Sequence, residues 1–169
     1  DLNSLYSIRS FFNASQKVER DEFQTFVQPL LTIYPVVHAF EWVPKVRYEE
    51  AADFVQSADG DGVQNFALLE TSPDGRRVAA GKRPEYYPAY YLSPIEGSEV
   101  ALGLDYASDP DRLEAMRRSV QSDRIALTRP IRLLRFAADE NDPYGLVAFI
   151  PVYQGATAPK DPGLRSERL

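Results

Sequence analysis

The chain has 169 residues, of which 44% are hydrophobic and 26% charged, a size and composition typical of one globular domain. Its formal net charge of −6 argues against the clustered basic surface with which proteins bind nucleic acid. The absence of cysteine excludes disulfide frameworks, thiolate zinc sites and cysteine nucleophiles.

The first 34 residues have helical periodicity. Apolar residues recur at helical spacing in residues 5–12 and again in residues 23–31, with a polar stretch between them. Pro29 predicts a kink or a restart in the second stretch. We therefore expect two helices, or one long broken helix, with apolar faces that pack on the domain or on a partner chain.

The rest of the chain alternates between strand and helix periodicity. Strand patterns cover residues 36–46, 64–71, 76–81, 84–94, 99–105, 125–138 and 145–153. Helix patterns cover residues 47–58 and 108–123, the second with Ser108 as its expected N-cap. Turn formers in SPDG and DENDPYG join neighbouring strands as hairpins. Hairpin-linked strands with helices to one side predict an α+β fold with an antiparallel sheet.

Catalytic and metal-binding motifs are absent from the sequence. His38 is the single histidine, and in its strand pattern we expect a structural role. The chain lacks the serine-hydrolase, zincin, P-loop and dinucleotide-binding motifs, and its acidic loops lack EF-hand spacing. We therefore expect no cofactor and no metal. A hydrolase built on two carboxylates distant in sequence stays open as a minor alternative.

The segment PEYYPAYYLSP, residues 84–94, holds four tyrosines in six positions. Tyrosine has an apolar ring and a hydroxyl that needs a hydrogen-bond partner, so these rings either close a core or line a pocket. If Pro88 leaves the strand alternation intact, Tyr86 and Tyr90 face one side, and Tyr87 and Tyr91 the other. An unsatisfied hydroxyl in a dry cavity costs about 1–3 kcal/mol, which favours water or a polar ligand there.

Six segments in order resemble the CHASE domain: FEWVPKV, RYEEAADF, YYPAYY, LGLD, ALTRPIRL and AFIPVY. The resemblance runs from about Leu5 to Tyr153. CHASE domains are extracellular sensory modules of bacterial histidine kinases and diguanylate cyclases, and of plant cytokinin receptors. The resemblance implies a stalk helix, then a PAS-like antiparallel sheet that holds the ligand, flanked by two membrane helices.

Applied to this chain, the resemblance implies three regions. Residues 1–34 would be the N-terminal stalk, through which two copies form a homodimer, and residues 35–153 the PAS-like ligand-sensing domain. The Pro/Gly-rich residues 154–169 would be a linker or the start of a truncated membrane-proximal part. The expected location is periplasmic, with the membrane reached only through flanking helices outside this sequence.

The resemblance also suggests ligand-binding residues. In the plant receptors the ligand meets an acidic side chain after the tyrosine strand and a threonine in an LT step. Where the plant pattern has a leucine, this chain has Arg117 and Arg118, and arginine selects carboxylate or phosphate rather than an adenine-type ligand. With the tyrosines, the expected ligand-binding residues are Tyr86, Tyr90, Glu96, Arg117 and Thr128.

The sequence thus predicts a non-enzymatic, extracytoplasmic small-molecule sensor, whose ligand shifts the arrangement of the stalk helices. The alternative is a dimerisation or protein-interaction ectodomain, with a sheet packed solid. A polar-lined cavity of a few hundred Å3 over the sheet favours the sensor, and a filled core favours the interaction module.

Overall fold

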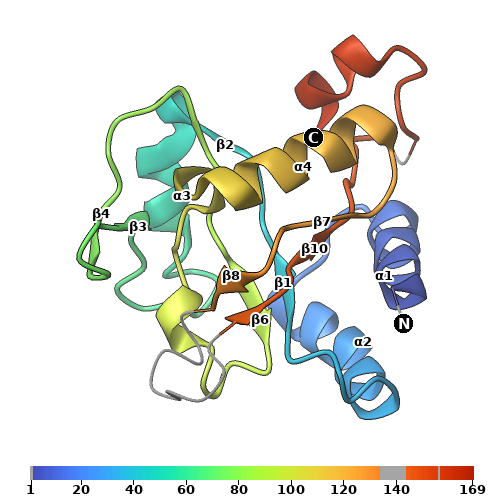
Figure 1. Ribbon diagram of the computed structural model, residues 1–169, viewed down its shortest axis with the longest axis horizontal. Coiled ribbons are helices and arrows are strands. Elements are labelled where there is room, and N and C mark those ends of the chain that lie inside the picture. Colours follow the sequence, from blue (N-terminus) through green and yellow to red (C-terminus); the bar gives the residue numbers. More distant parts are fainter. Residues whose placement is uncertain (1, 134–143, 156) are drawn as a thin grey trace.

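The computed structural model describes residues 2–133, 144–155 and 157–169 (Figure 1). It begins with two separate helices, α1 (Asn3–Ala14) and α2 (Arg20–Ile33). A capping box opens α2, because the backbone N–H of Glu19 donates to the Glu22 carboxylate at 2.9 Å. Pro29 lies inside α2, which continues to Ile33, so the helix does not restart at the proline.

The described strands are each two or three residues long. They pair antiparallel in separate two-stranded sheets rather than in one larger sheet. The pairs among the described residues are β1 (Phe40–Trp42) with β6 (Tyr91–Ser93), β2 (Val46–Arg47) with β5 (Glu85–Tyr86), β3 (Leu69–Thr71) with β4 (Arg77–Ala79), β7 (Ala126–Leu127) with β10 (Ala148–Phe149), and β8 (Ile131–Arg132) with β9 (Tyr144–Gly145). The fold is therefore mixed helix and antiparallel strand, as expected. Parts of the strand expected at 125–138 and of the turn after it lie outside the described residues.

Two further helices flank the strands. Helix α3 (Ala51–Ser57) follows a 3₁₀ turn, and α4 (Pro110–Ser122) contacts β7 and β10 (Figure 1). The expectation that Ser108 caps α4 is wrong: the Asp109 carboxylate accepts from the Arg112 N–H at 2.9 Å. Pro110 occupies the first helical position, which suits its fixed φ and its missing N–H, and this places the cap one residue later.

The strand expected over residues 99–105 is also wrong. Glu99–Ala101 form a 3₁₀ helix, and Gly103 then turns the chain with a φ of +77°. From this turn the Gly103 carbonyl accepts from the Leu69 N–H at 2.9 Å, and the Asp105 N–H donates to the Leu69 carbonyl at 2.7 Å. These two backbone hydrogen bonds, on either side of Leu104, hold the segment against Leu69 of β3.

The tyrosine stretch is divided at Pro88. Tyr86 ends β5 and Tyr91 begins β6, while Tyr90 and Tyr91 are both buried and their ring centroids lie 4.9 Å apart in a stacked arrangement. Because Pro88 lies between the two strands, the simple alternation of faces does not continue across it.

The main core lies between the N-terminal helices, β1 and β6, and α3. Phe23 and Val27 of α2 are almost fully buried there, and the Phe23 ring lies 5.9 Å from that of Tyr91. A smaller cluster forms around Leu104 and Tyr106. Helix α2 therefore packs on the strands of its own chain rather than extending away from them.

Residues 154–169, expected as a linker, contain two short 3₁₀ helices, Pro162–Leu164 and Ser166–Arg168. Arg165 between them donates through Nε to the Pro159 carbonyl at 3.0 Å, and through Nη1 to the carbonyl of Gln121 at the end of α4. The Ser166 carbonyl accepts from Lys45 Nζ at 2.6 Å. These bonds hold the segment against the rest of the domain.

Candidate functional site

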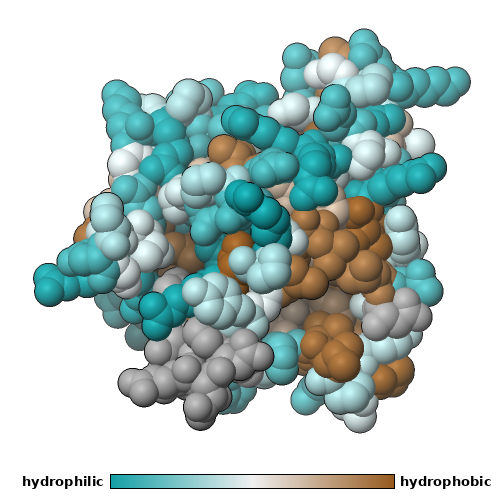
Figure 2. Space-filling view, in the orientation of Figure 1, coloured by the Kyte–Doolittle hydropathy of each residue, from teal (hydrophilic) through white to brown (hydrophobic). Residues whose placement is uncertain are grey.

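A cleft of about 1410 Å3 opens between α1, β1, α4 and β10. Figure 2 shows hydrophobic side chains gathered around a hollow on the side of the molecule where α1 and β10 lie in Figure 1. Its volume exceeds the several hundred Å3 usual for small-molecule sites, so a compact ligand would occupy part of it. The cleft is thus larger than the polar-lined cavity of a few hundred Å3 expected for a sensor, and its walls are mostly apolar.

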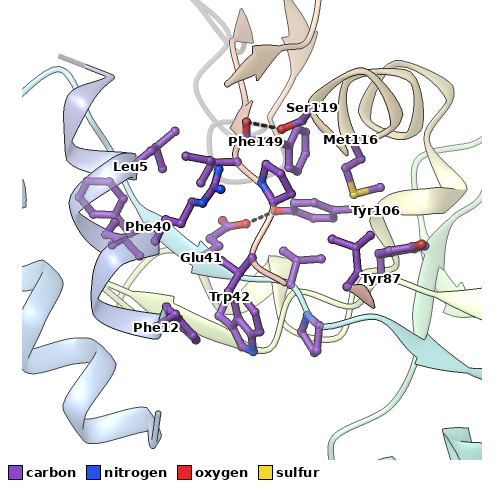
Figure 3. A pocket seen from close by; sticks show the side chains of 18 of the residues that line it. Leu5, Phe12, Phe40, Glu41, Trp42, Tyr87, Tyr106, Met116, Ser119 and Phe149 are labelled. Atoms are coloured by element: carbon purple, nitrogen blue, oxygen red, sulfur yellow. Dashed lines mark hydrogen bonds between the residues drawn. The ribbon is translucent and has the colours of Figure 1, made fainter. Parts of the chain in front are cut away.

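Helix α1 and strand β1 form one wall of the cleft. The apolar stripe of α1 presents Leu5, Ile8 and Phe12 to it, and the Phe12 ring stacks on Trp42 with centroids 4.2 Å apart (Figure 3). The same stripe that predicts a helix at the N-terminus thus supplies a wall of the cavity.

Helix α4 and strand β10 form the facing wall. The Ser119 hydroxyl joins them by donating to the Phe149 carbonyl at 2.9 Å, and Met116 lies one turn before it (Figure 3). The two walls are tied at one end by an ion pair, since Arg9 of α1 lies 2.8 Å from the Asp123 carboxylate that follows α4.

A polar pair lies at the centre of the cleft. Glu41 of β1 and Tyr106 point toward one another, and the tyrosine hydroxyl donates to the carboxylate (Figure 3). Burial raises the pKa of Tyr106 well above its ordinary value, and the Glu41 carboxylate raises it further, against the effect of Arg112. The hydroxyl therefore remains a proton donor at physiological pH. The Arg112 guanidinium lies 4.7 Å from the centroid of the Tyr106 ring.

Two of the five expected ligand-binding residues, Tyr90 and Arg117, line this cleft. Tyr90 is buried, and its hydroxyl donates to the Asp61 carboxylate. Burial and this bond raise the pKa of Tyr90. The Tyr90 ring is therefore part of the core and also lines the cleft. Arg117, by contrast, is exposed at the surface of α4.

The other three expected residues, Tyr86, Glu96 and Thr128, do not line the cleft. Tyr86 is buried, and its hydroxyl accepts from the Arg83 N–H at 3.4 Å. Thr128 is also buried, and its hydroxyl accepts from the backbone N–H of Val147 at 3.1 Å. Glu96 is exposed beside the turn that follows β6. The structure therefore does not bring these three together with Tyr90 and Arg117.

The sequence does not single out three residues at the centre of the cleft: Glu41, Tyr106 and Arg112. Glu41 falls within the expected strand 36–46, but its partner Tyr106 is 65 positions away, and only the fold brings the two together. Arg112 lies in the first turn of α4, among acids that resemble an ordinary solvated helix start. His38, expected in a strand, precedes β1 and lines the cleft.

The described residues contain no cluster of three or more metal-ligating side chains. Within residues 2–133, 144–155 and 157–169, no helix has the length and apolar character needed to cross a bilayer.

Comparison with known proteins gives one result. The family model of the CHASE domain matches residues 16–169, which is most of the chain. A search of curated proteins finds no match. CHASE domains are extracellular, non-catalytic sensory domains of receptors. The chain belongs to the CHASE domain family.

Proposed function

We propose that this domain binds a small molecule in the cleft between α1, β1, α4 and β10, as the extracytoplasmic sensor of a transmembrane receptor of the histidine kinase or diguanylate cyclase type. The observation that carries the proposal is the cleft itself, with mostly apolar walls and a few polar groups at its centre. This combination is typical of small-molecule sites, in which apolar surface supplies affinity and polar groups fix orientation.

The position of α1 supports a route from ligand to signal. Leu5, Ile8 and Phe12 line the cleft, so a ligand there contacts the N-terminal helix directly. A ligand shifts a two-state equilibrium only through a difference in affinity for the two states. Reversing the equilibrium from 1:99 to 99:1 takes about 5.5 kcal/mol, which a buried small molecule can supply by contacts made in only one position of α1.

Ligand binding is tested with a thermal-shift screen of amino acids, organic acids, nucleobases and sugars. We expect at least one class to raise the melting temperature, because a ligand that binds only the native state stabilises it by mass action. Ala148→Trp adds a bulky side chain to the cleft wall at β10 and is expected to reduce this shift. The matched control, Ala79→Trp on the exposed strand β4, is expected to keep it. An equal shift in both variants would place binding outside the cleft.

A second candidate function, dimerisation through the N-terminal helices, is favoured by exposed apolar residues on α1. Leu2 and Tyr6 lie one helical turn apart and are each 43% exposed. Such residues suit contact with the same face of a second copy.

The change that tests this dimer is Tyr6→Glu. We expect it to convert a dimer to a monomer in analytical ultracentrifugation, since it would place a charge on an apolar contact. Val78→Glu, at a residue that is 40% exposed on β4, is the control and is expected to leave the mass unchanged. A wild-type protein that is monomeric at all concentrations would contradict the proposal.

A further inference from the structure

The charge of the cleft differs from that of the whole chain. The chain carries a net charge of −6, yet its cleft is lined by five cationic side chains, Arg9, Lys17, Lys45, Arg112 and Arg117, and three anionic ones, Glu41, Asp61 and Glu85. A positive cleft in an acidic protein attracts anions.

Four of the five cations already have carboxylate partners. Arg9 pairs with Asp123 at 2.8 Å, Lys17 with Glu19 at 2.8 Å, Lys45 with Glu85 at 3.1 Å, and Arg112 with Asp109 at 3.5 Å. These pairs neutralise their own charges. The Arg112 pair is the longest of the four, and Arg117 has no carboxylate partner in the described part of the chain, so the remaining attraction comes from α4.

Arg112 is buried with an unmet donor. The residue is 7% exposed, and its Nη1 lies 3.5 Å from the Asp109 carboxylate, beyond a good hydrogen bond. Its buried Nε has no hydrogen-bond partner among the described residues. Buried guanidinium donors are normally satisfied, because leaving one unpaired costs free energy. A ligand acceptor would remove this cost only if the side chains that cover Nε moved aside.

Arg117 adds an accessible charge. It is exposed, lines the same cleft, and forms neither a hydrogen bond nor an ion pair with the described part of the chain.

From these contacts we infer that the cleft selects an organic monocarboxylate with a flat apolar body, whose carboxylate is held by Arg112 and attracted by Arg117. The inference rests on the proposed binding in the cleft and narrows it to one ligand class. Arginine donates well to carboxylates, and the Phe12–Trp42 stack offers apolar faces to a flat body. A ligand with one negative charge is favoured over a ligand with two, because two carboxylates lie near Arg112. Asp109 pairs with Arg112 directly, and Glu41 accepts from Tyr106, whose ring contacts the guanidinium.

The test compares three probes that share a benzene ring: phenylacetate, the neutral phenylacetamide, and the dianionic phenyl phosphate. We expect phenylacetate to raise the melting temperature more than either of the others at equal millimolar concentration. Arg112→Met is expected to weaken phenylacetate binding about 10- to 100-fold in calorimetric titration, since a hydrogen bond to a charged group is lost. Arg117→Gln is expected to weaken it less. Arg118→Gln, on the same helix but outside the cleft, is expected to leave it unchanged.

A second readout separates binding from a structural role. Replacing a poorly paired buried charge with an apolar side chain of similar length is often neutral or stabilising. Arg112→Met is therefore expected to keep or raise the melting temperature of the ligand-free protein while it loses phenylacetate binding. A lower melting temperature in the ligand-free variant would show that Arg112 supports the fold, and would overturn the inference.

The remaining outcomes distinguish this inference from the proposed function. If phenylacetamide matches or exceeds phenylacetate, and Ala148→Trp reduces both shifts, the cleft binds small molecules and the carboxylate inference is wrong. If phenyl phosphate binds best and loses affinity with Arg112→Met, the cleft selects phosphate and the inference is also wrong. If no probe and no member of the wider screen shifts the melting temperature, both the inference and the proposed function fail.

Discussion

Replacing Gly103 with alanine is expected to lower the free energy of unfolding by about 3 kcal/mol or more, or to prevent folding. A Cβ atom at this position would lie 2.1 Å from the backbone carbonyl oxygen of Ala67, and Gly103 has a φ of +77°. The left-handed conformation alone costs an L-residue about 1–2 kcal/mol, and the collision with backbone adds to it. Urea denaturation followed by circular dichroism measures the loss.

Gly62 provides a matched control, because its φ of +79° is nearly the same and a Cβ there would meet nothing within 4 Å. Gly62→Ala is expected to cost only about 1–2 kcal/mol, the backbone contribution by itself. The difference between the two variants therefore measures the collision with Ala67. Equal losses would contradict the prediction, since they would mean that this carbonyl moves aside freely.

Replacing Asp105 with asparagine is expected to destabilise the protein by about 3 kcal/mol, because it breaks a buried ion pair. The Asp105 side chain is fully buried; its Oδ1 accepts from the N–H groups of Tyr87 at 2.8 Å and Ala107 at 3.1 Å, and its Oδ2 from Arg83. An asparagine keeps the oxygen that holds the two backbone groups. Its amide would then turn a donor toward the guanidinium, and Arg83 would keep only Glu70 as a carboxylate partner.

The control for this change is Asp74→Asn. Asp74 pairs with Arg76 at 3.3 Å in an exposed turn, where solvent screens the two charges. We expect its urea midpoint to stay close to that of the unaltered protein. Comparable shifts of the urea midpoint in the two variants would contradict the prediction, since they would mean that burial does not strengthen the stabilisation by the Asp105 ion pair.

The sequence predicts the helices and the antiparallel class well, because both depend on local patterns. The apolar stripe of α2 and the acidic start of α4 can each be recognised from residues within one or two helical turns. The turn between β3 and β4 is equally local: the Ser72 hydroxyl donates to the Arg76 carbonyl at 2.9 Å, and Gly75 has a positive φ.

The division of the strands into separate pairs was not predictable from such patterns. The register of β1 on β6 pairs Phe40 with Ser93, residues more than fifty positions apart, and a strand of three residues carries too few alternations to specify its partner. The site was predictable only in part for the same reason. Tyr90 and Arg117, which are expected from the sequence to bind the ligand, line the cleft, but the hydrogen bond between Glu41 and Tyr106 exists only once the chain has folded.

The ion pair between Arg9 and Asp123 gives α1 a second attachment, to the residue that follows α4. Its two side chains are 16% and 27% exposed, so dissolved salt reaches and weakens it in part. An outward movement of α1 would have to break this ion pair. On the proposed mechanism, the balance between the two positions of α1 in the ligand-free protein is therefore expected to depend on the salt concentration.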